Sequence, residues 1–434
     1  MDVIEKFGNR VSSQALKDPE KARRLLLAGY RLQEKKLQFL PDRELPSSGQ
    51  YVARVVMKNI IQSLSEPENA AMVSIFVPGE LVMAAGLTPY SVEAMSCFMA
   101  GTKCEQTFLR KTEEEGFPET MCSYHRVFLG AALTGILPKP NCMIYTNLAC
   151  DGNMMTFPYL KDKFECPGFY IDVPYEKNRE SVLYVADQLR KLKEFIEKCT
   201  GKKVTDEALT ERLRRSKRTL EKFAQYEKES ADKYVPADLV TPLYVGMTNN
   251  LLLGTKEEED YVDRLLKDVK NAPAKKGKKI YWMHTIPFWS DAVKNELCFQ
   301  EKAQIVGCEL SHVCEPDFDP EKPYEAMARR MVYHALNGSA IRRIEAGIRH
   351  AKETGADGAV WFGHWGCKHT LGAAQLAKRK FEEQGIPLLI LDGDGCDRSH
   401  GGEGQTSTRL GAFLEMLNTE TDENTDRQEE SHDE

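Results

Sequence analysis

The chain has 434 residues, of which 41% are hydrophobic and 29% charged, so it has enough apolar side chains for two or three domains of roughly 150 residues. This composition excludes a chain that is disordered throughout, and no apolar run approaches the ~20 residues of a membrane helix. The net charge of −7 reflects residues 418–434, which hold eight acidic residues and one arginine and leave 58 acids and 58 bases elsewhere. A neutral body without a basic stripe argues against a nucleic-acid partner.

The cysteine content is best interpreted together with the cellular compartment. The N-terminal sequence MDVIEKFGNR has no apolar stretch of the kind found in signal peptides, so we expect a cytoplasmic protein. In that reducing compartment, the twelve cysteines are expected to be buried thiols or metal ligands rather than disulfides.

The first 70 residues are predicted to form an N-terminal helical layer, because apolar residues recur at helical spacing within 19–65. Residues 71–175 predict a first α/β lobe. Short apolar runs such as CMIYTNLA (142–149) and GFYIDV (168–173) alternate there with helical patterns. That alternation is typical of a parallel sheet with helical crossovers.

Residues 176–270 are predicted to be a helical connection with two long charged helices, the second beginning at Thr205. The lysine-rich segment 271–279 contains Pro273 and Gly277 and is the predicted domain boundary.

Residues 280–417 repeat the alternation of strand-like and helical patterns and predict a second α/β lobe, closed by a helix over 406–417. Residues 418–434 are expected to form a solvated, disordered acidic tail. The predicted fold is therefore α/β, with two Rossmann-like lobes, parallel sheets and the N-terminal helical layer.

The spacing of cysteines in the two lobes predicts one shared site. Cys122 and Cys150 are 28 residues apart, and Cys367 and Cys396 are 29 residues apart. In each pair, one cysteine precedes a helical pattern and the other follows a strand, which places both at the carboxyl edge of a parallel sheet. Two facing lobes would bring four thiols to one cleft, where helix N-termini lower the pKa of thiols. Such thiolates are the ligands of iron–sulfur clusters.

Each of these cysteines, taken alone, is more simply interpreted as a core thiol, because free cysteine is among the most buried residue types. The matched positions beside polar or glycine-rich segments favour a shared site. Five cysteines lack this context and are assigned to packing: Cys97, Cys104, Cys166, Cys199 and Cys298.

Five segments carry a family resemblance. They are GELVMAAGLTPY (79–90), GFPETMCSYHR (116–126), the strand ending in Cys150-Asp151, HWGCKHTLG (364–372) and GIPLLILDGDGCDRSHGGEGQTSTRLGAFLEML (385–417). Together they resemble the 2-hydroxyacyl-CoA dehydratase component family, which includes benzoyl-CoA reductase subunits and double-cubane cluster proteins. The resemblance covers residues 72–417.

The resemblance implies that Cys122, Cys150 and Cys367 bind a [4Fe–4S] cluster with one open iron site in the cleft between the lobes. Cys396 exceeds this three-cysteine pattern and is kept as a candidate ligand. Double-cubane relatives hold a larger [8Fe–9S] cluster with more cysteines, so the extra thiols leave the cluster type open. For Cys142 and Cys308, two further cysteines next to strands, core packing is the favoured interpretation.

The resemblance also implies a reaction and its partners. An (R)-2-hydroxyacyl-CoA would lose water through a ketyl radical, which forms when one electron is added to the thioester carbonyl and is later recovered. The electron would come from an ATP-dependent iron–sulfur activator protein, and a sister subunit or a second copy of the chain would complete the enzyme. The sequence has no G-x-x-x-x-G-K-[ST] loop, so the chain itself is not expected to use ATP.

Candidate catalytic residues lie near the predicted ligands. His364 and His369 flank Cys367, and either could donate a proton or a hydrogen bond at the cluster, with a structural histidine as the equally weighted alternative. Ser123 follows Cys122 and is a candidate to face the cleft. Glu80, at a strand-to-helix turn, is a candidate to orient the substrate.

Three alternatives to the dehydratase stay open at this point. The first is a double-cubane reductase of small molecules driven by an ATP-dependent activator, and the second is a benzoyl-CoA reductase-like subunit. The third is a metal-free α/β ligand-binding protein with buried thiols. Iron content separates the first from the dehydratase, because about eight rather than about four irons per chain are expected.

Overall fold

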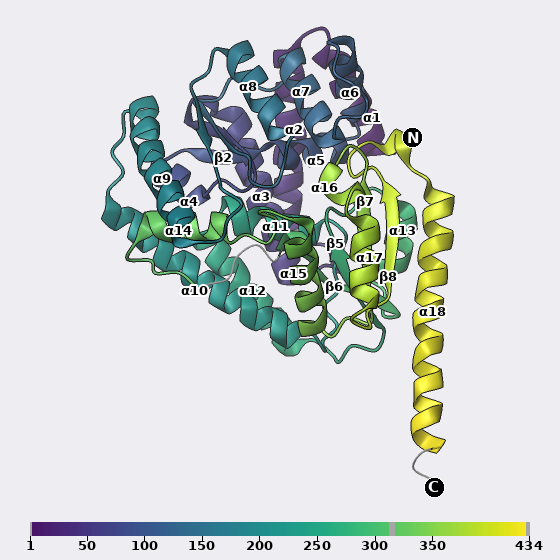
Figure 1. Cartoon of the computed structure of the whole chain (residues 1–434). Helices are drawn as coiled ribbons and strands as arrows, with labels where there is room; N and C mark the ends of the chain where they lie inside the picture. Colours follow the sequence, from purple (N-terminus) through teal and green to yellow (C-terminus); the bar gives the residue numbers. More distant parts are fainter. Residues whose placement is uncertain (1, 312–316, 431–434) are drawn as a thin grey trace.

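The computed structural model describes residues 2–311 and 317–430, with the side chains of all these residues except 420–430 (Figure 1). The protein has two four-stranded sheets, with the strand orders β2-β1-β3-β4 and β6-β5-β7-β8. All neighbouring strands are parallel. The predicted α/β class with two parallel sheets is confirmed.

Three helices precede the first sheet: α1 (Val3–Ala15), α2 (Pro19–Phe39) and α3 (Ser47–Ser65). Asp2 and Asp18 cap the first two helices, because their carboxylates accept hydrogen bonds from amides of the first turn that have no partner within the helix. Each helix buries one apolar face against the protein, with Leu26 and Val56 fully buried. The helices predicted within 19–65 are confirmed.

The first sheet consists of β1 (Ala70–Val73), β2 (Thr88–Ser91), β3 (Cys142–Thr146) and β4 (Gly168–Ile171). Its helices are α4 (Gly79–Ala84), α5 (Val92–Gly101), α6 (Glu105–Glu114), α7 (Ser123–Thr134) and α8 (Asn153–Phe164). Strand β3 lies between β1 and β4 and is buried along its whole length. The loop that follows β3 therefore starts in the middle of the carboxyl edge of the sheet.

Four helices form the predicted connection: α9 (Arg179–Thr200), α10 (Asp206–Ser230), α11 (Thr241–Leu251) and α12 (Lys256–Asn271). The side chain of Thr205 caps α10 by accepting a hydrogen bond from the Ala208 amide, as the sequence predicted. A loop over residues 272–277 then leads to the second sheet.

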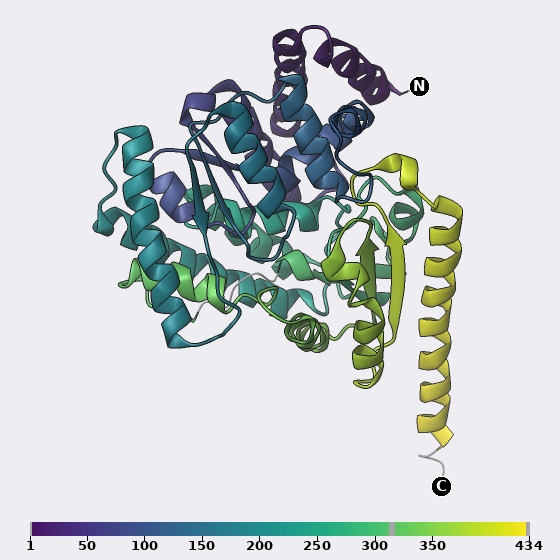
Figure 2. The same ribbon diagram turned by 45° about the horizontal axis from the view of Figure 1, so that its top comes forward.

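The second sheet consists of β5 (Lys278–Met283), β6 (Ala303–Cys308), β7 (Gly358–His364) and β8 (Leu388–Gly393). Its helices are α13 (Asp291–Leu297), α15 (Ala340–Glu353), α16 (Lys368–Leu371), α17 (Ala374–Glu382) and α18 (Glu403–Glu430). Helix α14 (Pro323–Val332) instead packs against α9 and α10, and its buried side chains share a core with the first sheet. Figure 2 shows the first sheet and its helices on one side of the molecule and the second sheet, flanked by α18, on the other.

Helix α18 extends past the predicted end of the closing helix at residue 417. The backbone of residues 418–430 continues this helix, where a disordered tail was expected, and residues 431–434 lie outside the described residues. None of the helices between residues 2 and 430 that the structure describes is long and apolar enough to cross a membrane.

Sheet topology changes the relation between the lobes that the cysteine spacing suggested. When the two sheets are superposed in strand order, β3 corresponds to β7 and β4 corresponds to β8. Cys150 follows β3 and Cys367 follows β7, so these two cysteines occupy equivalent places, whereas Cys396 follows β8. The predicted equivalence of the two cysteine pairs is wrong, because equal spacing matched different strands.

Candidate functional site

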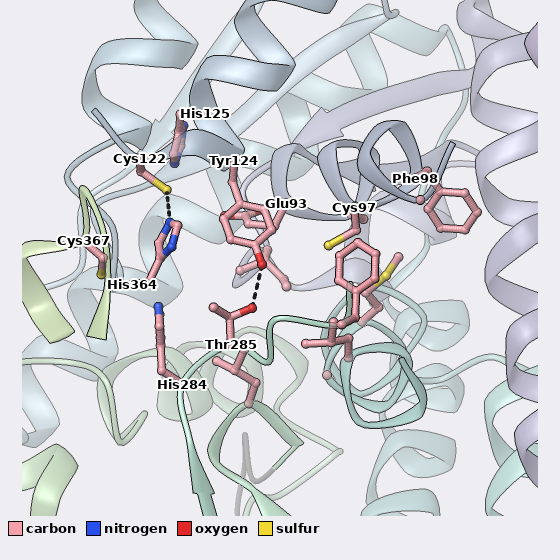
Figure 3. A pocket seen from close by; sticks show the side chains of 18 of the residues that line it. Glu93, Cys97, Phe98, Cys122, Tyr124, His125, His284, Thr285, His364 and Cys367 are labelled. Atoms are coloured by element: carbon pink, nitrogen blue, oxygen red, sulfur yellow. Dashed lines mark hydrogen bonds between the residues drawn. The ribbon is translucent and has the colours of Figure 1, made fainter. Parts of the chain in front are cut away.

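A cavity of about 1750 Å³ is lined by residues of both lobes, and Cys122, Cys150 and Cys367 all lie in its wall. Figure 3 shows Cys122 and Cys367 at this cavity. Cys122 precedes α7, Cys150 follows β3 and Cys367 precedes α16, so three separate chain segments supply the thiols. Four histidines also line the cavity: His125, His284, His364 and His369. The strand ends and helix starts thus gather thiols and imidazoles from both sheets.

The loop between β7 and α16 comes very close to the start of α7. Gly366 in this loop has a φ of +78°, and a Cβ atom on it would lie 2.6 Å from the backbone nitrogen of Cys122. Only glycine fits this combination of left-handed backbone and close approach. The close backbone contact brings the segments that carry Cys122 and Cys367 together.

His364 makes a directed contact with one of the thiols. Its Nδ1 accepts a hydrogen bond from the Gly395 backbone amide at 3.1 Å, so the proton of the neutral ring is on Nε2. Nε2 lies 3.2 Å from the Sγ of Cys122 and therefore donates a hydrogen bond to it. This places the predicted residue His364 in contact with a candidate ligand.

His125 makes a similar contact in the first lobe. Its Nε2 lies 3.3 Å from the Sγ of Cys150, and its Nδ1 lies 2.8 Å from the hydroxyl of Thr156. Burial lowers the pKa of His125 to about 4, with the nearby His364 as a second cause, so the ring is neutral near pH 7. Both thiols therefore have a neutral imidazole as a neighbour.

Burial raises the pKa of Cys122 well above its ordinary value, and the thiols of Cys150 and Cys367 raise it further. The His125 amide, in the first turn of α7, lowers this pKa as expected of a helix N-terminus, but burial and the neighbouring thiols outweigh it. Burial, Glu93 and Cys367 raise the pKa of Cys150 to about 12. Because Cys367 contributes to the raised pKa of both Cys122 and Cys150, the three thiols are electrostatic neighbours.

Three thiols around one cavity are a donor set of the kind that iron–sulfur clusters use. Within residues 2–311 and 317–430, no group of three or more His, Cys, Asp and Glu side chains is arranged to hold one ion. In a cluster each thiolate binds a different iron, so the thiols are spread around a larger inorganic core. Cys122, Cys150 and Cys367, which surround one cavity from three segments, are the residues that would hold it.

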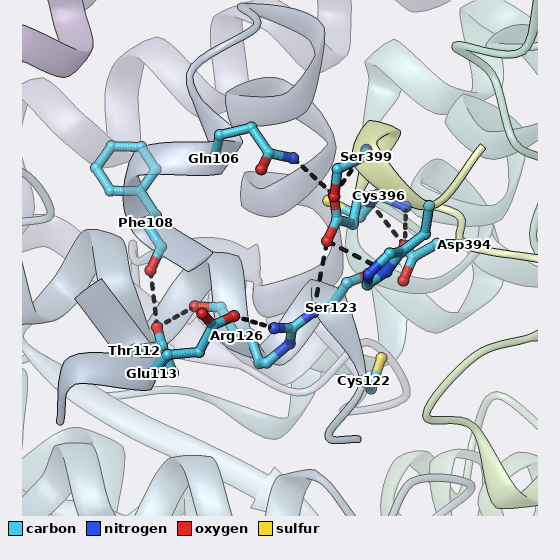
Figure 4. Close-up of polar contacts among 12 residues, drawn as sticks. Gln106, Phe108, Thr112, Glu113, Cys122, Ser123, Arg126, Asp394, Cys396 and Ser399 are labelled. Atoms are coloured by element: carbon cyan, nitrogen blue, oxygen red, sulfur yellow. Dashed lines mark hydrogen bonds and ion pairs between the residues drawn. The ribbon is translucent and has the colours of Figure 1, made fainter. Parts of the chain in front are cut away.

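Cys396 and Ser123 lie behind the cavity wall rather than in it. Cys396 is fully buried, and its thiol points to the backbone oxygen of Ser96 at 3.6 Å. The Ser123 hydroxyl donates a hydrogen bond of 2.5 Å to Asp394, which also accepts from the amides of Cys396 and Asp397 (Figure 4). These contacts fix the start of α7 to the loop that follows β8.

Glu80 lies elsewhere in the fold. It is fully buried on α4, where its carboxylate is 2.6 Å from the guanidinium of Arg330 and accepts a hydrogen bond from Ser216 at 2.8 Å. Glu80 is not part of the cavity wall. These contacts join α4 to α10 and α14.

Comparison with known proteins identifies the family of this chain. A family model described as 2-hydroxyglutaryl-CoA dehydratase, D-component, matches residues 74–417. The chain belongs to this D-component family. The resemblance found in the sequence is confirmed.

Relatives of this D-component family protein include subunits of two kinds of enzyme. The (R)-phenyllactyl-CoA dehydratase alpha subunit of Clostridium sporogenes is 22% identical over 367 residues, 78% of this chain and 87% of the relative. The beta subunit of the same enzyme is 26% identical over 366 residues, 79% of this chain and 90% of the relative. A benzoyl-CoA reductase subunit of Thauera aromatica is 21% identical over 388 residues, 80% of this chain and 88% of the relative.

The cavity of this D-component family protein contains three polar residues that the sequence analysis did not single out: Glu93, His284 and Thr285. Glu93, on the first turn of α5, has one buried carboxylate oxygen without a hydrogen-bond partner, and burial raises its pKa. The Tyr124 hydroxyl meets that of Thr285 at 2.7 Å and joins the two lobes. His284 precedes Thr285. This polar His-Thr pair directly after a strand was the one feature of the sequence that could have indicated that both residues lie at the cavity.

Proposed function

We propose that this chain is the iron–sulfur subunit of an ATP-activated dehydratase that removes water from an (R)-2-hydroxyacyl-CoA. Three thiols from three segments around one cavity of about 1750 Å³ carry the proposal. Membership of the D-component family and the two phenyllactyl-CoA dehydratase relatives support it.

When bound, a [4Fe–4S] cluster supplies single electrons at low potential, the chemistry that a ketyl-radical dehydration requires. The chain's residues prepare the site for this chemistry. His364 and His125 hold Cys122 and Cys150 in place by hydrogen bonds. Apolar and aromatic residues such as Phe98, Met247 and Phe288 line much of the remaining cavity. Such a lining helps to exclude water from the reacting groups once a substrate fills the cavity.

The proposal includes two partners and a compartment. The energy for the electron comes from a separate ATP-dependent iron–sulfur activator, since the sequence has no phosphate-binding loop of its own. A sister subunit, or a second copy of this chain, completes the enzyme, in line with the alpha and beta subunits among the relatives. Oxygen-sensitive chemistry of this kind fits the cytoplasm of an anaerobically growing cell.

Anaerobic purification with iron and sulfide analysis and EPR tests the metal site. We expect about four irons per wild-type chain and loss of most iron in Cys122→Ala, Cys150→Ala and Cys367→Ala. Cys298→Ala, a half-buried thiol outside the cavity wall, is the matched control and keeps its iron. Full iron in all three site variants would refute the proposed site.

Activity is tested with the activator, ATP, a reductant and (R)-2-hydroxyacyl-CoA esters. Formation of the unsaturated acyl-CoA supports the dehydratase. About eight irons per chain, lost also in Cys396→Ala, would instead support the double-cubane reductase. Reduction of an aromatic CoA ester would support the benzoyl-CoA reductase-like subunit, in line with the third relative.

A further inference from the structure

His284 is held at the cavity in an unusual backbone conformation. It follows the last residue of β5 and has a φ of +78°, in the left-handed region that non-glycine residues avoid. Such strain persists only where the surrounding structure enforces it, and it is concentrated at functional sites. The His284 backbone oxygen faces the thiol of Cys308 at 3.6 Å, a contact that helps to hold this turn.

The ring of His284 differs from the rings of His125 and His364, the two histidines in contact with the thiols. His125 and His364 each use both ring nitrogens in contacts with the protein. Among the described residues, the imidazole of His284 has no hydrogen-bond partner, although it lines the cavity. Its centroid lies 6.2 Å from that of His364, and Figure 3 shows a ring nitrogen directed toward the region of His364 and Cys367.

The charge state of His284 follows from its surroundings. Burial lowers its pKa well below the ordinary value, and Arg343, His364 and His369 lower it further. The ring is therefore neutral near pH 7 and offers one N–H donor and one nitrogen acceptor. A neutral imidazole can polarise a carbonyl oxygen without transferring its proton, so it can donate where negative charge develops.

We infer that His284 donates a hydrogen bond to the thioester carbonyl oxygen of the bound acyl-CoA and is a catalytic residue of the dehydration. This inference rests on the proposed function. In that reaction one electron from the activator enters the carbonyl group and puts negative charge on its oxygen. Hydroxide then leaves C2, a proton leaves C3 and the electron is returned, so the net change is loss of water. The His284 N–H stabilises the oxygen while it is negative and keeps its own proton.

Three substitutions separate the ring from the backbone strain. His284→Gly removes both, His284→Ala removes the ring but keeps the strain, and His284→Asn keeps an amide donor in a residue that tolerates a positive φ. All three are prepared anaerobically, and their iron content and resting EPR spectra are compared with the wild type. We expect these two properties to be unchanged, because His284 is not a proposed ligand.

Turnover is measured with (R)-phenyllactyl-CoA and 2-hydroxyglutaryl-CoA. We expect kcat to fall about 10²–10³-fold in His284→Gly and His284→Ala, the usual effect of removing one donor to a developing oxyanion. His284→Asn should retain more activity than either. If the wild type is active and the kcat of His284→Gly lies within twofold of the wild-type kcat, the role of His284 is overturned. If the wild type dehydrates neither ester under full activation, the proposed function is overturned as well.

A second readout does not depend on turnover. The ester with a ¹³C-labelled thioester carbonyl is bound without the activator, and its carbonyl stretch is measured by infrared difference spectroscopy. The inference predicts a lower stretching frequency in the wild type and His284→Asn than in His284→Gly, because a hydrogen bond weakens the C=O bond. Identical frequencies in the wild type and His284→Gly would contradict the proposed contact, whatever the kinetics.

Discussion

The hydrogen bond from His364 to Cys122 gives a prediction at the residue scale. Hydrogen bonds to cluster sulfurs are one of the factors that set the reduction potential, because they stabilise the more negative, reduced state. His364→Ala should therefore lower the potential, on the order of tens of millivolts, as expected for losing part of the roughly 1.5–3 kcal/mol of a charge-assisted hydrogen bond. Anaerobic EPR redox titration measures the shift. The control is His369→Ala, because His369 lies in the same cavity wall but makes no hydrogen bond to a thiol of the described residues. Equal shifts of the reduction potential in both variants would contradict the prediction.

Glu93 gives a second prediction, which concerns pH. Burial raises the pKa of its carboxyl group, so the folded protein favours the protonated form. The free energy of unfolding should therefore fall as pH rises above the ordinary glutamate value of about 4.3. Glu93→Gln removes this loss, and we expect it to be more stable than the wild type at pH 8 by about 1–3 kcal/mol, the usual cost of a buried unpartnered polar group.

Urea unfolding of the anaerobic protein at pH 5 and pH 8 checks this sign. The stability difference between Glu93→Gln and the wild type should be larger at pH 8. The exposed residue Glu119 provides the control, because Glu119→Gln should change stability little at either pH. A difference that shrinks as pH rises would show that Glu93 is held as a stabilised anion.

The sequence predicted one part of the site better than the other. The local pattern of cysteines at helix starts and strand ends pointed to Cys122, Cys150 and Cys367, which line the cavity together with His364 beside Cys367. The same pattern also pointed to Cys396, which lies behind the cavity wall. The place of Glu93 in the cavity wall could not be predicted, because it depends on α5 packing beside the segment that carries Cys150. Such contacts depend on tertiary packing, which cannot be read from local patterns along a single sequence.

At the scale of secondary structure elements, the loop between β7 and α16 gives a third prediction. A Cβ on Gly366 would meet backbone atoms of Met121 and Cys122, within 2.6–2.8 Å, which cannot move as a flexible side chain could. Gly366→Ala should therefore lower the free energy of unfolding by more than the roughly 1–2 kcal/mol expected for a left-handed backbone alone. It should also reduce iron binding. Gly385→Ala is the matched control, because Gly385 has a φ of +72° but open space around its Cβ position.

Stability and iron content of the two variants are measured together. We expect Gly385→Ala to lose only the conformational part of the stability and to keep its iron. Similar losses of stability and iron in both variants would show that glycine is needed at position 366 only for its backbone conformation, and not for the close approach to the start of α7.

The elements themselves were largely predictable. The sheets follow from alternating apolar runs, and caps such as Thr205 mark helix starts. Strand β2 (Thr88–Ser91) was not predicted, since TPYS has a proline at its second position and is too short for an alternation. The equivalence of β3 with β7 was also missed, because strand order within a sheet depends on long-range pairing.

At the scale of the whole molecule, the two lobes are joined by buried charges. Arg126 on α7 is 1% exposed and lies 2.6 Å from Glu113 in its own lobe and 3.6 Å from Asp397 in the other (Figure 4). Gln106 also donates a hydrogen bond to Asp397 across the same boundary, at 2.6 Å. Burying such a pair gives little net stability, but removing one partner leaves an uncompensated buried charge.

Arg126→Ala should therefore lower the free energy of unfolding by about 3–5 kcal/mol. The double variant Arg126→Ala, Asp397→Asn should recover part of this loss, because it also removes the carboxylate left without its cation. As a control, Lys191→Ala breaks an exposed ion pair with Asp187 and should lower the free energy of unfolding by less than about 1 kcal/mol.

Denaturant unfolding gives these free energies, and hydrogen exchange shows where protection is lost. If Arg126 joins the lobes, exchange rises in α7 and in the loop after β8 together; a rise confined to α6 and α7 would assign it to the first lobe alone.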